Sequence, residues 1–158
     1  MTVPAPWRVM FDSNAYDEIL RHGDVERLRA LIAAGKLIIV TTHVQEDELR
    51  QIADAEKQKR LLSAFYKLRT QNSPTSVALW GVSKWGQSNW TGPQQEADLN
   101  AIKRSRPIAS RDEIIGTTAK DHCDAFVTED KKFAARLTEA APKLRLLNYD
   151  TFRREVLK

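Results

Sequence analysis

Residues 37–49 read LIIVTTHVQEDEL, an apolar run that passes directly into a polar stretch. The run LIIVT is uninterrupted, contains β-branched residues and follows a Gly-Lys turn, which is typical of a strand buried on both faces. Thr42 and Gln45 have the spacing of a capping box, so we expect a helix to begin directly after the strand. A strand that leads straight into a helix is the repeating unit of a parallel α/β sheet.

Three further apolar runs have the same character. They are WRVMF (7–11), DAFVT (124–128) and LRLLN (144–148), and each is followed by apolar residues at helical spacing. Strands separated by helices predict a three-layer α/β/α fold with a central parallel sheet of four to five strands. No internal repeat or linker interrupts the pattern, so we expect a single domain over residues 1–158.

Periodicity is lost between residues 71 and 93, where Gln, Asn, Ser, Gly and Pro dominate. Trp80, Trp85 and Trp90 recur every five residues in this stretch, a spacing that suits neither a helix nor a strand. We predict a long loop or loose hairpin inserted into the domain. Its tryptophans could stack on the bases of a single strand, or form a small satellite core or a dimer contact.

Composition and charge restrict the class of protein. The net charge of +4 and the pI of about 9.3 favour a polyanionic partner, although only weakly. No apolar run approaches the roughly 20 residues that span a bilayer, and the N-terminus has no signal-peptide pattern, so no membrane partner and a cytoplasmic location are expected. Cys123 is the single cysteine and no CxxC pair is present, which argues against a disulfide and a zinc site.

Basic residues gather in the helical stretch near residues 56–70, where they are candidates for contacts with nucleic-acid phosphates. Solvated helix faces explain such a cluster about as well. The candidates are Lys57, Lys59, Arg60, Lys67 and Arg69.

Acidic residues fall where strands give way to helices. Asp12 follows the first strand, Asp130 lies two residues past the third, and Asp112 lies in the first turn of a capped helix. Glu48 shares a helical face with apolar residues, and its neighbour Asp47 is a credible substitute. Because ligands of open parallel sheets bind at the carboxyl ends of the strands, we expect acids from four segments to converge at one edge.

A cluster of carboxylates repels itself unless a cation is present. Hard oxygen ligands select Mg²⁺ or Mn²⁺, which could orient a water molecule, lower its pKa and stabilise the charge on a phosphate. No obvious Cys-His pair offers a side-chain nucleophile. Metal-activated hydrolysis of a phosphodiester is the chemistry that this pattern favours.

Four stretches of the chain, taken in order, resemble the PIN-domain nucleases, the family that includes the VapC-like toxins. They are VMFDSNAY (9–16), TTHVQEDEL (41–49), RDEIIGTTA (111–119) and DAFVTEDKKF (124–133). The third and fourth match best, because an Asp opens a helix with small residues and an apolar strand then enters T-x-D-x-x-F. Together they extend over most of the chain.

The resemblance implies a metal-dependent endoribonuclease with RNA as its substrate. It also suggests the toxin half of a toxin–antitoxin pair, an antitoxin-like inhibitor protein and a homodimer. Asn14 and Thr128 match positions that support the ligands or contact a phosphate. The implied catalytic and metal-binding acids are Asp12, Glu48, Asp112 and Asp130, with Asp47 as the alternative second acid.

Two other functions stay open. The first is a catalytically silent PIN fold that serves as an RNA-binding or assembly module. The second is an aspartate-based phosphoryl-transfer domain, since Asp12 at a strand end resembles an aspartyl-phosphate site. A haloacid-dehalogenase-like phosphatase would have a second Asp two residues later, where this chain has Asn14.

Overall fold

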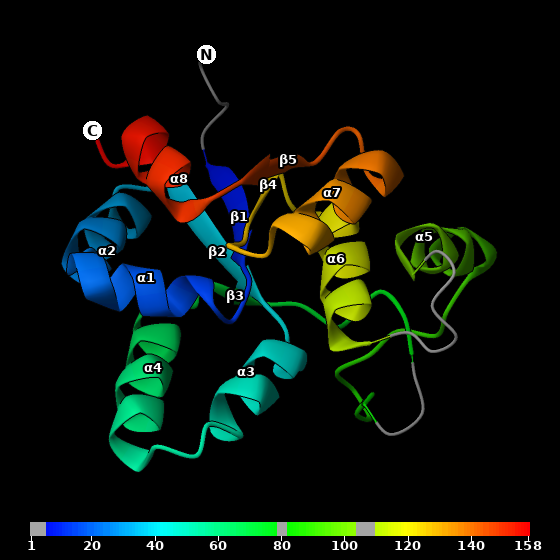
Figure 1. The fold of residues 1–158 in the computed structure, drawn as a ribbon, viewed down its shortest axis with the longest axis horizontal. Coiled ribbons are helices and arrows are strands. Elements are labelled where there is room, and N and C mark those ends of the chain that lie inside the picture. The colour runs from blue at the N-terminus through cyan, green and yellow to red at the C-terminus, as the bar shows by residue number, and fades with distance from the viewer. Residues whose placement is uncertain (1–5, 79–81, 104–109) are drawn as a thin grey trace.

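One parallel sheet forms the centre of the computed structural model, which describes residues 6–78, 82–103 and 110–158. Its five strands run in the order β3-β2-β1-β4-β5 (Figure 1). The predicted α/β class and the parallel sheet are therefore confirmed. The strands are β1 (Trp7–Phe11), β2 (Leu37–Thr41), β3 (Gln71–Asn72), β4 (Ala125–Val127) and β5 (Arg145–Leu147).

Helices connect the strands and begin close to where the sequence predicts them. Gln45 Oε1 accepts the Thr42 amide at 2.6 Å and Glu113 Oε2 accepts the Ser110 amide at 2.7 Å, as expected of two capping boxes. The first helix stops at Gly23, whose φ of 67° suits a residue without a Cβ. The helices are α1 (Ala15–His22), α2 (Val25–Ala33), α3 (His43–Arg50), α4 (Ala55–Leu68), α5 (Pro93–Lys103), α6 (Arg111–His122), α7 (Lys131–Ala140) and α8 (Tyr149–Val156).

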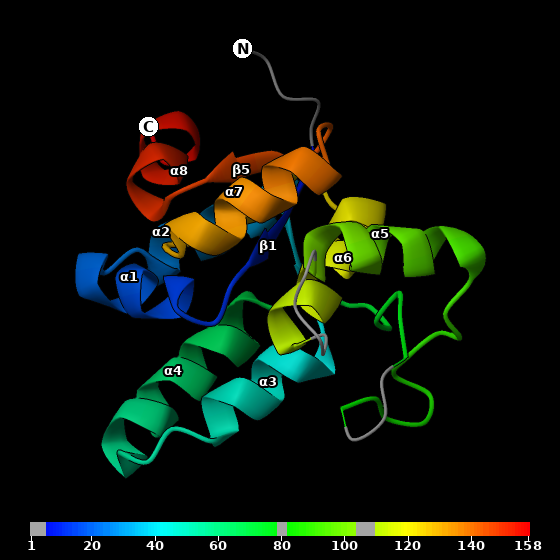
Figure 2. The ribbon, with the colours of Figure 1, turned by 45° about the vertical axis from the view of Figure 1, so that its right-hand side comes forward.

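The two faces of the sheet belong to two hydrophobic clusters. Val9 and Phe11 of β1 pack on one side with α1, α2, α4 and α8. Met10 of the same strand packs on the other side, with Val40, Phe126 and residues of α5, α6 and α7. Figures 1 and 2 show these groups of helices on opposite sides of the sheet. Because successive side chains of a strand point to opposite faces, uninterrupted apolar strands produce this three-layer arrangement.

The order of the strands places a switch point between β1 and β4. The chain leaves β1 toward β2 on one side, whereas it leaves β4 toward β5 on the other. Phe11 pairs with Val127, and the Asp12 amide donates to the Val127 carbonyl at 2.9 Å, so Asp12 and Thr128 follow their strands side by side. Such a switch point opens a crevice at the carboxyl edge of the sheet, where ligands bind.

The stretch from 71 to 93 is largely the loop that the sequence predicts. Before α5 begins at Pro93, its described residues contain only the short exposed strand β3 and an isolated bridge between Thr75 and Ser88. The two residues of β3 carry no apolar pattern, which is why sequence periodicity misses this strand. Trp80 lies outside the described residues. None of the described helices combines the length and the apolar character that crossing a membrane requires.

Candidate functional site

Asp12 lies at the carboxyl end of β1 and only 7% of it is exposed. Its Oδ2 accepts the Thr128 hydroxyl at 2.8 Å, and its Oδ1 accepts the Ser13 amide at 2.8 Å. Burial raises the pKa of Asp12 above its ordinary value, and the charge of Asp130 raises it further, although both hydrogen bonds lower it. The carboxylate is therefore fixed in place beside a second acid.

Glu48 reaches the same site from α3. The Ser13 hydroxyl donates a hydrogen bond to its carboxylate, which joins the end of β1 to this helix. Burial raises the pKa of Glu48 to about 7, and the charges of Asp12 and Asp112 add to the effect, whereas the Ser13 bond and Arg111 oppose it. Glu48 is thus a half-buried acid that faces other acids.

Asp112 enters from the first turn of α6. Burial raises its pKa to about 6, and the charges of Asp12, Glu113 and Asp130 contribute, while Arg136 lowers it. No residue within the described part of the chain donates a hydrogen bond to this carboxylate. Asp112 is consequently a partly buried carboxylate without a hydrogen-bond donor among those residues.

Asp130 stands at the N-terminus of α7. Its Oδ1 accepts the Phe133 amide at 2.9 Å, so it caps the helix. Its own amide donates to Thr128 Oγ1 at 3.1 Å, the hydroxyl that also donates to Asp12. The capping role coexists with a charge that raises the pKa of both Asp12 and Asp112. Acids from β1, α3, α6 and α7 therefore lie near enough for their charges to influence one another's pKa.

Asp47 and Asn14, the two other candidate residues, have partners outside the group of four acids. Asp47 turns away to Lys84, with 2.7 Å between Oδ1 and Nζ, so the structure places Glu48 rather than Asp47 beside the other acids. Asn14 is exposed, and its Oδ1 accepts the Glu129 amide at 3.5 Å across the switch point. Asn14 thus links the loops that follow β1 and β4.

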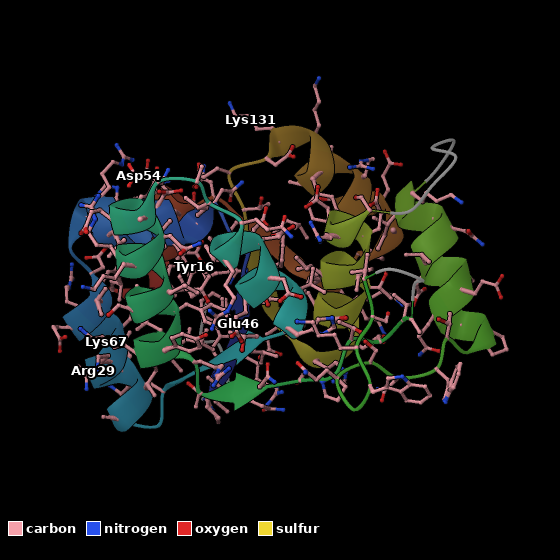
Figure 3. All side chains as sticks on the ribbon, turned by 90° about the horizontal axis from the view of Figure 1, so that it is seen from below. Tyr16, Arg29, Glu46, Asp54, Lys67 and Lys131 are labelled. Carbon is pink, nitrogen blue, oxygen red and sulfur yellow. The ribbon has the colours of Figure 1, made fainter. Side chains whose placement is uncertain are left out.

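Three of the predicted phosphate-binding cations lie around one hollow of the surface. Lys59, Arg60 and Lys67 line a hollow of about 390 Å³ between α1, α2 and α4, and none of the candidate acids lines it. Figure 3 shows Lys67 at the end of α4 opposite to Asp54. The remaining two cations form ion pairs, Lys57 with Asp17 at 3.3 Å and Arg69 with Glu46 at 3.7 Å.

Sequence reasoning missed two residues that shape the site. Ser13 holds Glu48, yet it lies between two more conspicuous residues, Asp12 and Asn14, and has no periodic signal of its own. Gln45 donates from Nε2 to the Phe11 carbonyl at 2.5 Å, which fixes the backbone just before Asp12. Its capping role was visible in the sequence, but its second hydrogen bond depends on how α3 packs against β1.

The donor set consists of carboxylate oxygens, which suit Mg²⁺ or Mn²⁺ rather than a soft metal. The acids are near enough to raise one another's pKa, and a cation would relieve that repulsion. Throughout residues 6–78, 82–103 and 110–158, however, no three His, Cys, Asp or Glu side chains converge closely enough to hold one ion together. The carboxylate oxygens therefore fit a hard cation in their chemistry, although in this structure no three of the described acids are close enough to one another to bind a single ion.

Comparison with known proteins adds little to this picture. The chain matches no family profile, and no curated protein matches it. One similar solved structure is described as VapBC2 from Rickettsia felis bound to a DNA fragment from their promoter. It is 14% identical, with a TM-score of 0.48, and the match covers 89% of this chain and 98% of that one. A likeness at this level identifies neither the family nor the activity of the present protein.

Proposed function

We propose that the protein is a Mg²⁺- or Mn²⁺-dependent endoribonuclease that hydrolyses RNA phosphodiester bonds at the carboxyl edge of the sheet. The observation that supports this best is the charge of the site. Burial and neighbouring carboxylates raise the pKa of Glu48 to about 7 and that of Asp112 to about 6. Acids perturbed in this way at a switch point are costly for the fold and typical of functional sites.

The four acids share one task in this proposal. Asp12, Glu48, Asp112 and Asp130 would hold the metal, which when bound lowers the pKa of a water molecule and neutralises charge on the phosphate. The Thr128 hydroxyl keeps one oxygen of Asp12 oriented, and the Ser13 hydroxyl does the same for Glu48. Such supporting hydrogen bonds fix the direction of the ligand lone pairs.

The surroundings of the acids are suited to a polyanionic substrate. Arg111 directly precedes Asp112, and Lys131 and Lys132 directly follow Asp130. Both lysines are exposed, and Figure 3 shows Lys131 reaching into solvent. Cations that border an acidic centre attract the phosphates of the substrate, while the centre itself binds the metal. RNA is the substrate that the sequence resemblance implies.

The test is cleavage of labelled RNA and DNA oligonucleotides in Mn²⁺, in Mg²⁺ and in EDTA. An Asp12→Asn, Asp112→Asn double variant, prepared in parallel, exposes any contaminating ribonuclease. We expect metal-dependent cleavage of RNA that the variant lacks. Because water rather than the RNA 2′-hydroxyl attacks, the products should carry no cyclic phosphate. Equal cleavage by parent and variant, or cleavage that persists in EDTA, contradicts the proposal.

A second candidate is a silent module that binds RNA without cutting it. It is favoured by the finding that no three acidic or other metal-binding side chains converge among the described residues. Calorimetry with Mn²⁺ separates the two, because the nuclease requires binding that the double variant loses. The silent module predicts no such heat and no cleavage by well-folded protein.

Within the nuclease proposal, the toxin role, an antitoxin-like inhibitor and a homodimer are finer predictions. A toxin should arrest growth when it is expressed, and the Asp12→Asn, Asp112→Asn variant should not. Light scattering of the purified chain measures whether it dimerises. Normal growth with an active enzyme would exclude the toxin role and leave the nuclease intact.

A further inference from the structure

Two tryptophans are the most exposed large apolar side chains of the described structure. Trp85 is 94% exposed and Trp90 is 86% exposed. Within the described residues, the only other exposed large side chain with an apolar body is Tyr66, at 40%. Leaving an indole in water forgoes the favourable burial of its apolar surface, so two of them in one short loop indicate a binding surface.

The loop that carries them is held by backbone hydrogen bonds. The Thr75 amide donates to the Gln87 carbonyl at 3.0 Å, and the Asn89 amide donates to the Thr75 carbonyl at 2.8 Å. Gly86 takes a left-handed φ of 71° at the turn, and the Gln87 amide closes it onto the Lys84 carbonyl at 3.1 Å. Both indoles therefore project from a fixed backbone, which lowers the entropy lost on binding.

This loop is attached to two helices that carry candidate catalytic acids. Lys84 binds Asp47, the residue before Glu48 on α3, and the His43 ring lies 3.1 Å from the Val82 carbonyl. At the base of the loop, the Ser76 amide donates to the Thr118 hydroxyl of α6, the helix that begins with Asp112, at 3.0 Å. The tryptophan loop is thus anchored to both α3 and α6.

We propose that Trp85 and Trp90 form a base-stacking surface that binds single-stranded RNA beside the acidic site. An indole face stacks on any base, so two exposed indoles on one loop suit an unpaired strand rather than a duplex whose bases are already stacked. The loop is bonded to α3 and α6, the helices that carry Glu48 and Asp112, so the position of the two indoles relative to these acids is fixed. The inference rests on the proposed nuclease function for its substrate, and it adds a preference for single strands.

Binding can be measured without cleavage. The parent for this experiment is the Asp12→Asn, Asp112→Asn protein in EDTA, and the probe is a fluorescently labelled oligouridylate followed by anisotropy. A Trp85→Leu, Trp90→Leu pair keeps apolar bulk and loses the aromatic face, whereas a Trp85→Phe, Trp90→Phe pair keeps an aromatic face. Stacking is worth about 1–3 kcal/mol per base, so the leucine pair should bind at least about tenfold more weakly. The phenylalanine pair should stay within about threefold of the parent.

A duplex probe and steady-state kinetics are the two further measurements. A labelled RNA duplex should bind equally to all three proteins, and in the active protein the leucine pair should raise KM for single-stranded RNA while leaving kcat unchanged. Equal affinity of parent and leucine pair for oligouridylate, or no binding by the parent, overturns the inference and assigns the exposed indoles to another partner such as a protein. Tryptophan-dependent binding without cleavage by the unsubstituted chain would sink the nuclease proposal alone. Cleavage of single-stranded RNA with the same KM in the active protein and in its leucine pair would contradict this inference and leave the nuclease proposal intact.

Discussion

The Thr128 hydroxyl donates a 2.8 Å hydrogen bond to Asp12 Oδ2, and its oxygen accepts the Asp130 amide at 3.1 Å. A single side chain therefore joins the end of β1, the end of β4 and the start of α7. Because Thr128 is 4% exposed, water cannot readily replace it. The position of Asp12 relative to Asp130 depends on this hydroxyl.

Replacing Thr128 with valine tests that dependence, since valine keeps the shape and removes the hydroxyl. Loss of the hydrogen bond should raise the pKa of Asp12 further and weaken its hold on the metal, so the acidic limb of the pH–rate profile should move to higher pH. We expect kcat/KM to fall about 10- to 100-fold, the usual cost of losing a ligand's hydrogen-bond partner. Thr128→Ser should recover most of the activity. A valine variant with an unchanged pH profile would show that the hydroxyl is merely structural.

Glu48 and Asp47 are adjacent in the chain but have different partners, so a matched pair of variants separates them. Glu48→Gln should abolish most Mn²⁺ binding, because Glu48 faces Asp12 and Asp112. Asp47→Asn removes the ion pair with Lys84, whose side chain is 47% exposed, and should leave Mn²⁺ affinity within about threefold. Titration calorimetry measures both. The reverse ranking of the two variants would transfer the metal-binding role to Asp47.

The sequence predicts much of this fold because the strands of a buried parallel sheet are continuous apolar runs. The stretches 7–11 and 37–41 coincide with β1 and β2, whereas 124–128 and 144–148 each exceed the observed strand by one residue at either end. β3 was not predicted because it consists of two exposed polar residues, Gln71 and Asn72. A short strand that forms by pairing with its neighbour, as β3 does with β2, needs no apolar pattern in its own sequence.

The site is less evident from sequence than the sheet. Acids after strands could be located, since chain position alone sets them at the carboxyl edge. The choice between Asp47 and Glu48 required the direction of each side chain on α3. The hydrogen bond from Ser13 to Glu48 required the packing of that helix against β1. Lys59, Arg60 and Lys67 are expected to contact phosphates, and the structure places them around a hollow between α1, α2 and α4 that none of the candidate acids lines, a position that sequence periodicity alone does not give.

The raised pKa of Glu48 should make its contribution to stability depend on pH. The pKa of Glu48 rises from an ordinary value of 4.5 to about 7 on folding, so the folded protein binds more protons between these values. The contribution of Glu48 to the free energy of unfolding therefore falls as pH rises through this range. In EDTA, Glu48→Gln should be more stable than the parent at pH 8, by about 1–3 kcal/mol, and nearly equal at pH 4.

Urea unfolding at several pH values, followed by circular dichroism, measures this difference. Mn²⁺ should stabilise the parent at pH 8 and have little effect on Glu48→Gln, because binding to the folded state alone adds stability. Parallel stability curves for the two proteins across pH 4 to 8 would show that Glu48 is not destabilising in the folded state.

Asp24 should behave in the opposite way, because it is a buried acid with partners. Its side chain is 1% exposed, and it accepts hydrogen bonds from the Tyr149 hydroxyl at 2.9 Å and from Arg153 Nε at 2.5 Å. Burial alone would raise the pKa of Asp24, but these bonds outweigh it and hold the pKa below its ordinary value. The carboxylate thereby ties the start of α2 to α8.

Asp24→Asn should cost about 2–4 kcal/mol of unfolding free energy at pH 7, because Arg153 and Tyr149 lose a charged acceptor in a buried setting. A group with a lowered pKa stabilises the fold above its unfolded pKa, so the difference between parent and variant should shrink as pH falls below about 4. Glu26→Gln is the matched control on α2, since its ion pair with Arg29 is exposed and should contribute less than about 1 kcal/mol. Urea unfolding at pH 7 and pH 3 measures all three proteins. Equal losses for the two variants at pH 7 would mean that the contact of Asp24 with α8 adds nothing beyond a surface charge.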